Sequence, residues 1–346
     1  MGEMPWYNLA FEKRAKKKTR VFEAPAPLAP IADTHAHLTC FWSKDSAECL
    51  GRAALAGVRQ LTTLWDPLGD HRDLATFQGQ LAGWLARARA LLAEVPEGAA
   101  QPVPDAGNDG RGAGEGRGGA GGGPAALPDT VRYLAGVHPY GAPVYTDAVH
   151  AQVLAALDDP LCVGVGEIGL DYHVDYDDHV TPAPHDVQMA CMARQLEVAV
   201  ARNLPVELHL RNADGDDARE AHADAYHVLE QVGVPAAGCV LHCFGEDRAT
   251  MERFVELGCF IAFGGAATFG RNEAVREAFA ATPSGRILFE TDCPYMAPMP
   301  IRGLECEPAM IAFTVDALSR DRAERTGEDP AAIQRAAWDN ARRLFG

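Results

Sequence analysis

The chain has 346 residues, of which 47% are apolar, and its formal net charge is −17. This length and composition predict one large globular domain, or two small ones, with an extensive core. The charge argues against a protein that is held to nucleic acid mainly by a broad basic surface. It does not argue against a nuclease whose metal ions meet the phosphate locally.

Cysteine usage and hydropathy bear on the compartment. The nine cysteines are scattered, odd in number and include no Cys-x-x-Cys pair. A disulfide framework is therefore not expected, and a reducing, cytoplasmic location is the simpler interpretation. The sequence has neither an apolar run long enough to span a membrane nor the apolar segment of a secretory signal at its start. We expect no membrane partner.

Residues 1–29 form a basic N-terminal extension, and its run 13–20 is opposite in charge to the rest of the chain. Such a run is consistent with a nucleic-acid contact or with a solvated, partly ordered extension, and we expect the second. Pro25, Pro27 and Pro30 break any helix before the first strand. The domain predicted to follow covers residues 30–346.

Short apolar strands alternate with helical segments through this domain. The strands are expected at about 31–35, 58–64, 131–137, 162–171, 205–209, 238–242, 259–264 and 287–292. This alternation favours parallel βαβ units, and eight of them in roughly 300 residues predict an α/β fold, a TIM (β/α)8 barrel. A doubly wound open sheet is the alternative, but no Gly-rich dinucleotide fingerprint supports it.

One segment interrupts the pattern. Residues 96–128 contain eleven glycines, several prolines and almost no large apolar side chain. Such a segment cannot bury enough surface to offset its ordering entropy. We interpret it as a disordered Gly-rich insertion in a surface loop of the single barrel domain.

Histidines and carboxylates follow five of the predicted strands. In a TIM barrel the carboxyl ends of the strands carry the chemistry, so these side chains should meet at one rim. His35 and His37 are two residues apart and project to the same face of an extended chain. The other candidates are Glu167, His209, His242 and Asp292.

Four imidazoles and two carboxylates suit two divalent metal ions better than one, because a single tetrahedral site would be overfilled. Glu167 is the best bridging candidate, since a carboxylate has two oxygens. One division places His35, His37 and Asp292 with Glu167 around one ion, and His209 and His242 with Glu167 around the other. Such a pair lowers the pKa of a bound water, and Asp292 could accept its proton. The ligand types are compatible with Mg, Mn or Zn.

Six short segments together resemble the TatD-type metal-dependent hydrolases of the amidohydrolase superfamily. They are Asp33-Thr34-His35-Ala36-His37, Gly136-Val137-His138-Pro139, Gly166-Glu167-Ile168-Gly169-Leu170-Asp171, His209-Leu210-Arg211, Leu241-His242-Cys243-Phe244 and Glu290-Thr291-Asp292-Cys293-Pro294-Tyr295. The resemblance runs from about residue 31 to 346 and is interrupted by the insertion. It implies a (β/α)8 barrel, a two-metal site with the same six ligands, and phosphodiester hydrolysis, often as a deoxyribonuclease.

The resemblance also implies that His138, Arg211 and Tyr295 lie near the substrate phosphate. Arg can form two charge-assisted bonds to a phosphate, although an ion pair at the barrel rim is an equal alternative for Arg211. The chain departs from the family pattern at Cys293, where the family usually has Ser, and at Cys306, where it usually has Asn. Cys293 could be a soft metal ligand, but we expect an inert, packed thiol.

The leading hypothesis is a deoxyribonuclease, with Glu167 and Asp292 as catalytic residues and two divalent ions as cofactors. The charge of −17 favours short or single-stranded ends of DNA over long duplexes. An alternative keeps the barrel and metals but hydrolyses a small ester, lactone or amide. A non-catalytic nucleic-acid adaptor that uses the basic run is the third hypothesis.

Overall fold

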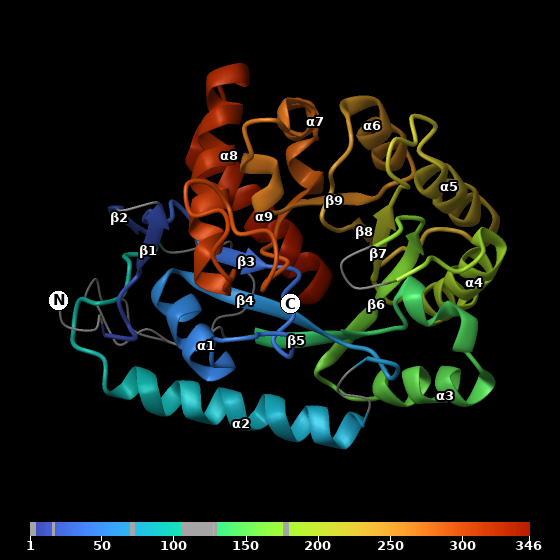
Figure 1. Ribbon diagram of the computed structural model, residues 1–346, viewed down its shortest axis with the longest axis horizontal. Helices are drawn as coiled ribbons and strands as arrows, with labels where there is room; N and C mark the ends of the chain where they lie inside the picture. The colour runs from blue at the N-terminus through green and yellow to red at the C-terminus, as the bar shows by residue number, and fades with distance from the viewer. Residues whose placement is uncertain (1–4, 16–17, 70–72, 105–126, 128–129, 176–179) are drawn as a thin grey trace, which may run out of the picture.

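The eight predicted strands form one parallel sheet that curls into a nearly closed barrel (Figure 1). The computed structural model describes residues 5–15, 18–69, 73–104, 127, 130–175 and 180–346. The strands are β3 (Ile31–Asp33), β4 (Val58–Trp65), β5 (Thr130–Ala135), β6 (Cys162–Asp171), β7 (Val206–Arg211), β8 (Cys239–Leu241), β9 (Phe260–Phe263) and β10 (Ile287–Phe289). Each pairs with the next in chain order, as successive βαβ units require.

The first and last strands meet to close the barrel. The amide of Thr34 donates to the carbonyl of Phe289 at 3.2 Å, and the amide of Asp292 donates to the carbonyl of His35 at 2.9 Å. A parallel bridge between Ala36 and Cys293 continues this seam. The seam therefore lies between the two segments that carry the His35/His37 pair and Asp292.

Helices surround the barrel. They are α1 (Ser46–Leu55), α2 (Leu74–Ala93), α3 (Asp147–Ala156), α4 (His185–Arg202), α5 (Glu220–Val232), α6 (Arg248–Glu256), α7 (Glu273–Ala281), α8 (Ile311–Thr326) and α9 (Pro330–Phe345). Several begin with a side-chain cap that accepts a hydrogen bond from the first turn, such as Asp45 before α1 and Asp247 before α6. None of the helices in the described ranges combines the length and hydrophobicity that a membrane span requires.

Helix α9 covers the end of the barrel where the strands begin. Its Trp338, Leu344 and Phe345 form one apolar cluster with strand residues, among them Leu134 and Leu288. Asn340 fixes the helix there by donating to the carbonyl of Ile287 at 3.0 Å. With that end filled, the opposite end, where the strands finish, remains for a functional site.

The N-terminal extension differs from its prediction. It is more ordered than expected, because it contains an antiparallel hairpin of β1 (Ala10–Ala15) and β2 (Lys18–Glu23), although β2 is mostly exposed to solvent, as expected. Phe11 is 4% exposed and packs edge-on against Phe313 of α8, with ring centroids 5.7 Å apart. The guanidinium of Arg52 lies over the same ring. Phe11 and Phe22, which flank the charged run, pack against the core and hold the hairpin against the barrel, so the basic residues belong to an ordered element.

The Gly-rich insertion begins later than predicted. Residues 96–104 lie within the described chain, and Gln101 donates through its amide to the carbonyl of Leu55 at 2.8 Å and through its side chain to that of Ala24 at 3.1 Å. Ala100 packs against the core. The predicted disorder falls chiefly on residues 105–126, which lie outside the described residues.

Candidate metal centre

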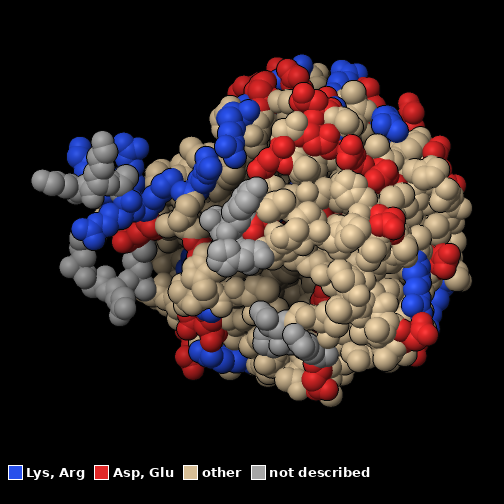
Figure 2. Space-filling view, turned by 45° about the vertical axis from the view of Figure 1, so that its right-hand side comes forward, with Lys and Arg blue, Asp and Glu red and all other residues tan. Residues whose placement is uncertain are grey.

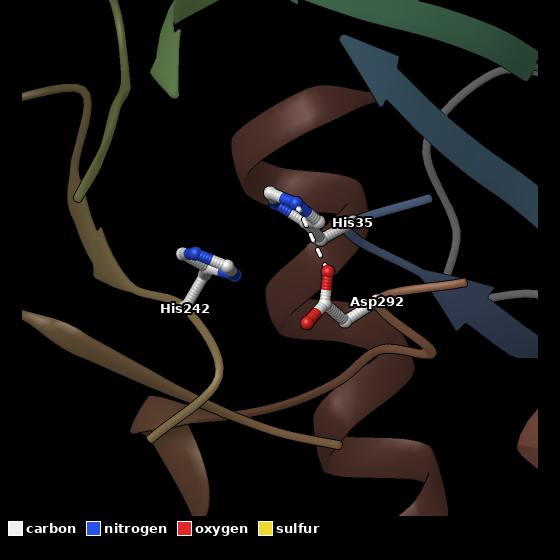
Figure 3. Close-up of side chains that lie close together, drawn as sticks. All are labelled: His35, His242 and Asp292. Carbon is white, nitrogen blue, oxygen red and sulfur yellow. Dashed lines mark ion pairs between the residues drawn. The ribbon is translucent and has the colours of Figure 1, made fainter. Parts of the chain in front are cut away.

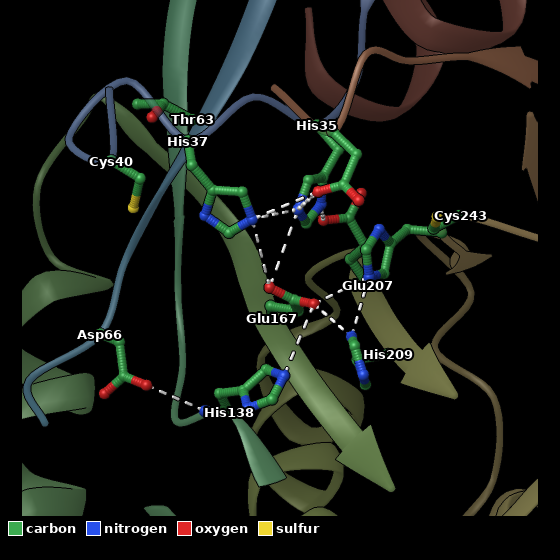
Figure 4. Close-up of polar contacts among 12 residues, drawn as sticks. His35, His37, Cys40, Thr63, Asp66, His138, Glu167, Glu207, His209 and Cys243 are labelled. Atoms are coloured by element: carbon green, nitrogen blue, oxygen red, sulfur yellow. Dashed lines mark hydrogen bonds and ion pairs between the residues drawn. The ribbon is translucent and has the colours of Figure 1, made fainter. Parts of the chain in front are cut away.

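The carboxyl ends of five strands bring the six predicted ligands into one cluster. His35 and His37 follow β3, Glu167 belongs to β6, His209 to β7, His242 comes directly after β8, and Asp292 comes three residues after β10. His35, His37, Glu167 and His209 face one another in Figure 4. Asp292 lies 3.7 Å from His35, and His242 lies 2.8 Å from Glu167. The structure thus places the six side chains together, and their role as metal ligands stays a prediction.

Glu167 stands between two histidine pairs. Its Oε2 lies 3.7 Å from His35 Nε2 and 3.8 Å from His37 Nε2. Its Oε1 lies 2.6 Å from His209 Nδ1 and 2.8 Å from His242 Nε2. One carboxylate therefore presents one oxygen to each pair, which is the arrangement that a bridging ligand needs.

The local backbone of β6 places this carboxylate. The pairing of β6 with β7 shifts register between Val165 and Ile168, and an irregularity of this kind re-aims a side chain next to an active site. Gly169 follows with φ of +144°, and a Cβ there would stand 2.0 Å from the carbonyl oxygen of His209. Glycine is therefore required where β6 passes close to β7.

Asp292 joins the first histidine pair. Its Oδ1 lies 3.7 Å from His35 Nε2 and 3.5 Å from His37 Nε2. The His242 ring stacks on that of His35, with centroids 3.9 Å apart and planes 9° from parallel (Figure 3). Asp292 adopts φ of +54°, a conformation that Asp tolerates better than most residues and that is enriched at functional sites.

The donor set fits divalent cations. His35 Nε2 and His37 Nε2 are only 3.0 Å apart and point toward the same carboxylate oxygens, a convergence that a shared cation would satisfy. Within the described chain, the groups compatible with a metal include His35 with His37 and Glu167, and Glu167 with His209 and His242. These two groups have Glu167 in common, whereas Asp292 groups with His35 and His242. The division of the ligands between two ions stays a prediction.

Charge within the cluster keeps the Glu167 carboxylate ionised. Burial raises the pKa of Glu167, but the imidazoles of His242 and His209 outweigh burial and hold that pKa well below its usual range. Burial lowers the pKa of His209, yet the Glu167 carboxylate more than compensates and raises it to about 10. A cation that replaces this proton would release it to solvent, so metal binding should be weaker at low pH.

A second set of carboxylates holds the histidine rings, and the sequence motifs did not predict this role for them. Glu207 Oε1 lies 2.7 Å from His35 Nδ1, and Asp171 Oδ2 lies 3.1 Å from His209 Nε2. Both carboxylates are fully buried. Such partners fix the tautomer of a ligating histidine and orient its ring. The available signal was Glu207 itself, an acidic residue within an apolar strand and two residues before His209.

The three predicted substrate contacts lie at different distances from the cluster. His138 Nε2 is 3.9 Å from Glu167 Oε1, and the His138 amide donates to Asp66 Oδ2 at 3.0 Å. Tyr295 is 49% exposed, and its ring centroid is 6.1 Å from that of His37. Arg211 lies farther out at the rim, where its guanidinium is 3.9 Å from Asp175 Oδ2.

The two cysteines that depart from the family pattern are packed. Cys293 and Cys306 are both fully buried, and the amide of Cys293 donates to the hydroxyl of Thr291. Burial raises the pKa of the Cys293 thiol well above its usual range. A buried, protonated thiol is a poor metal ligand, which favours the packed interpretation over the soft-ligand one.

A cavity of about 250 Å³ adjoins the cluster. It reaches from His37, His138 and Glu167 on one side to the apolar side chains of Trp65 and Phe77 on the other. The cavity gives a small group beside the cluster a partly apolar surrounding.

A (β/α)8 barrel with histidine and carboxylate side chains gathered at the strand ends is typical of metal-dependent hydrolases. Within this class the chain belongs to the family described as TatD related DNase, whose sequence profile matches residues 125–346.

Similar proteins and a solved structure support this family assignment. An uncharacterized metal-dependent hydrolase, YcfH of Escherichia coli K12, is 34% identical over 217 residues, which are 63% of this chain and 74% of the relative. A Mycobacterium tuberculosis protein described as an uncharacterized metal-dependent hydrolase is 28% identical over 91% of this chain and 98% of its own length. A Rahnella protein named as a 3'-5' ssDNA/RNA exonuclease is 32% identical over 63% of this chain and 78% of its own length.

The crystal structure of YjjV, a TatD homolog from Escherichia coli K12, superimposes with a TM-score of 0.64 at 26% identity. It covers 92% of this chain and 98% of its own. The predicted fold and family are thus confirmed.

Proposed function

We propose that this metal-dependent hydrolase cleaves phosphodiester bonds and acts as a deoxyribonuclease on short or single-stranded ends. The observation that carries the proposal is the position of Glu167, with one oxygen toward each histidine pair. A relative named as a 3'-5' ssDNA/RNA exonuclease supports the substrate class.

The residues that would hold the two cations are those around the shared carboxylate. His35, His37 and Asp292 would hold one with Glu167, and His209 and His242 would hold the other. When bound, the cations supply Lewis-acid chemistry, because they lower the pKa of water and neutralise charge on phosphate oxygens. Asp292 would receive the proton of the attacking water, since its Oδ1 faces the His35/His37 side of the cluster.

Residues around this cluster would position the substrate. His138 lies beside Glu167 and can donate a hydrogen bond to a phosphate oxygen. Tyr295 stands at the exposed edge of the cluster. Arg211 would reach a phosphate only by leaving Asp175. The net charge of −17 repels a long duplex beyond the site, whereas a short or frayed end experiences less of that field.

A small ester, lactone or amide is the second candidate substrate. The cavity beside Glu167, with Trp65 and Phe77 in its wall, is the observation that favours it. The adaptor hypothesis predicts binding of nucleic acid without hydrolysis.

The test is metal analysis of the purified chain followed by a substrate panel. Single-stranded DNA, duplex DNA, RNA and simple esters would be compared with Mg, Mn and Zn. We expect two metal ions per chain and fastest cleavage of single-stranded DNA. Cleavage of esters alone would favour the second candidate, and binding without cleavage would favour the adaptor.

Substitution of the bridging residue sharpens this test. Glu167→Ala should lower the rate by about a thousandfold or more, because both cations lose a ligand. Circular dichroism should be unchanged, since the core does not depend on this carboxylate. Glu252→Ala, on the exposed face of α6, is the matched control and should keep full activity. A fully active Glu167→Ala variant would show that Glu167 is not a ligand shared by two catalytic cations.

A further inference from the structure

Two segments beside the candidate metal centre carry exposed apolar side chains, and Trp42 and Tyr295 among them adjoin one another. Trp42 is 63% exposed, Tyr295 49%, Met296 45% and Met299 43%. They belong to the segments that follow β3 and β10, which also contain His37 and Asp292. Exposed large apolar residues that gather at one place mark a binding surface more often than single ones do.

The aromatic rings form a stepped path away from the cluster. The ring centroid of Tyr295 is 6.1 Å from that of His37, and the centroid of Trp42 is 6.3 Å from that of Tyr295. Glu305 holds the first segment against the second, because its carboxylate accepts from the amides of Trp42 at 2.7 Å and Ser43 at 3.1 Å. The aromatic surface is therefore fixed in position before any ligand arrives.

The basic hairpin reaches the same region. Lys13 Nζ donates to the carbonyl of Pro300, in the segment that carries Met299, at 3.0 Å. Lys13 pairs with Arg20, and Ala15 with Lys18, so Lys13, Lys18 and Arg20 share one face of the hairpin. Figure 2 shows Lys and Arg gathered at the left of the view, the side on which Figure 1 places the hairpin. Between residues 12 and 23, six are Lys or Arg and two are Glu.

We propose that Trp42 and Tyr295, with Lys13, Lys18 and Arg20, form a binding track that guides a single strand of nucleic acid into the metal cluster. The inference rests on the proposed function and assigns it a substrate surface. Bases stack on exposed aromatic rings whatever their sequence, and cations along the same path bind the phosphates. A duplex keeps its bases stacked on one another, so the track favours unpaired strands.

Charge complementarity favours a single strand of nucleic acid over a protein partner as the ligand of this track. The chain as a whole carries −17, and the hairpin is a basic region next to the aromatic path. A polyanion is attracted to this local positive field, whereas the acidic remainder of the surface repels it. The path also begins at His37, a predicted metal ligand, so a bound strand would end where cleavage is proposed.

The experiment measures binding apart from cleavage. Full-length protein in EDTA would be titrated against a fluorescein-labelled single-stranded DNA of twelve nucleotides, and fluorescence anisotropy would report Kd. We expect Trp42→Ala to weaken binding by about fivefold to a hundredfold, because one stacked base loses its platform. Trp42→Phe should keep most of the affinity, since the ring remains. Near-ultraviolet circular dichroism checks the fold of each variant.

The basic face is tested through its salt dependence. A double variant, Lys18→Gln with Arg20→Gln, should reduce the slope of log K against log salt by about 1.4, the value for two lost single-strand phosphate contacts. Arg248→Gln is the control, because Arg248 is an exposed cation on α6, far from the hairpin (Figure 1). It should leave both Kd and slope unchanged.

The outcomes separate this inference from the proposed function. If wild-type protein cleaves single-stranded DNA while Trp42→Ala and the double variant bind it as wild type does, the track is wrong and the nuclease stands. If binding depends on these residues but no substrate in the panel is cleaved, the track stands and the nuclease is wrong. Equal affinity for a blunt duplex would overturn the preference for single strands.

Discussion

At the scale of single residues, the cluster works as two layers of polar groups. The inner layer consists of imidazoles and carboxylates that face one another, and the outer layer consists of buried carboxylates that hold the rings. Glu207 holds His35, and Asp171 holds His209. Each pair leaves one ring nitrogen directed at Glu167, so the outer layer determines which nitrogen is available for a cation.

Glu207 offers a direct test of this arrangement. In Glu207→Leu, His35 Nδ1 loses its partner, and we expect metal affinity to fall by about tenfold to a hundredfold. Glu207→Gln should reduce metal affinity much less, because an amide oxygen can accept the same hydrogen bond. Calorimetric titration with Mn or Zn measures both, and circular dichroism checks the fold. Equal affinity in the leucine variant would show that packing alone orients His35.

At the scale of elements, the sequence predicts the barrel strands well because each is a short apolar run between helical segments. The six ligands could be predicted for the same reason, since strand ends converge in a barrel. The hairpin was not predicted because the basic run 13–20 dominates this segment, and Phe11 and Phe22, which flank the run, were not recognised as apolar contacts. The rim position of Arg211 depends on Asp175, which comes from a different strand end, and no local pattern predicts that contact.

The hairpin should detach without unfolding the barrel. Phe11→Ala removes the ring that packs on Phe313, and an isolated two-stranded hairpin is marginally stable in water. We expect hydrogen exchange to accelerate in Ala10–Ala15 and Lys18–Glu23, whereas the barrel strands keep their protection. Val21→Ala is the matched control, because Val21 is half-exposed on the same hairpin. Unchanged exchange in Phe11→Ala would place the anchoring contacts elsewhere.

At the scale of the whole molecule, the cluster joins strand ends that are far apart along the chain. His37 follows the first barrel strand and Asp292 follows the last, so a cation held by both spans the seam that closes the barrel. Cations would also offset part of the −17 charge, which otherwise opposes compaction. Metal binding and barrel stability should therefore be linked.

Metal removal tests this linkage. A ligand that binds only the folded state stabilises it by about 2.7 kcal/mol at a free concentration of one hundred times Kd. For a chain of 346 residues, with an unfolding entropy of about 2.1 cal/mol/K per residue, that amount corresponds to a rise in Tm of roughly 4 °C. We expect the metal-free chain to melt lower by this amount, with Tm rising as Mn or Zn is added, by differential scanning calorimetry. In Glu167→Ala, Tm should depend much less on added metal, because the variant lacks the proposed shared ligand. An equal rise in Tm in wild type and variant would place the stabilising metal elsewhere.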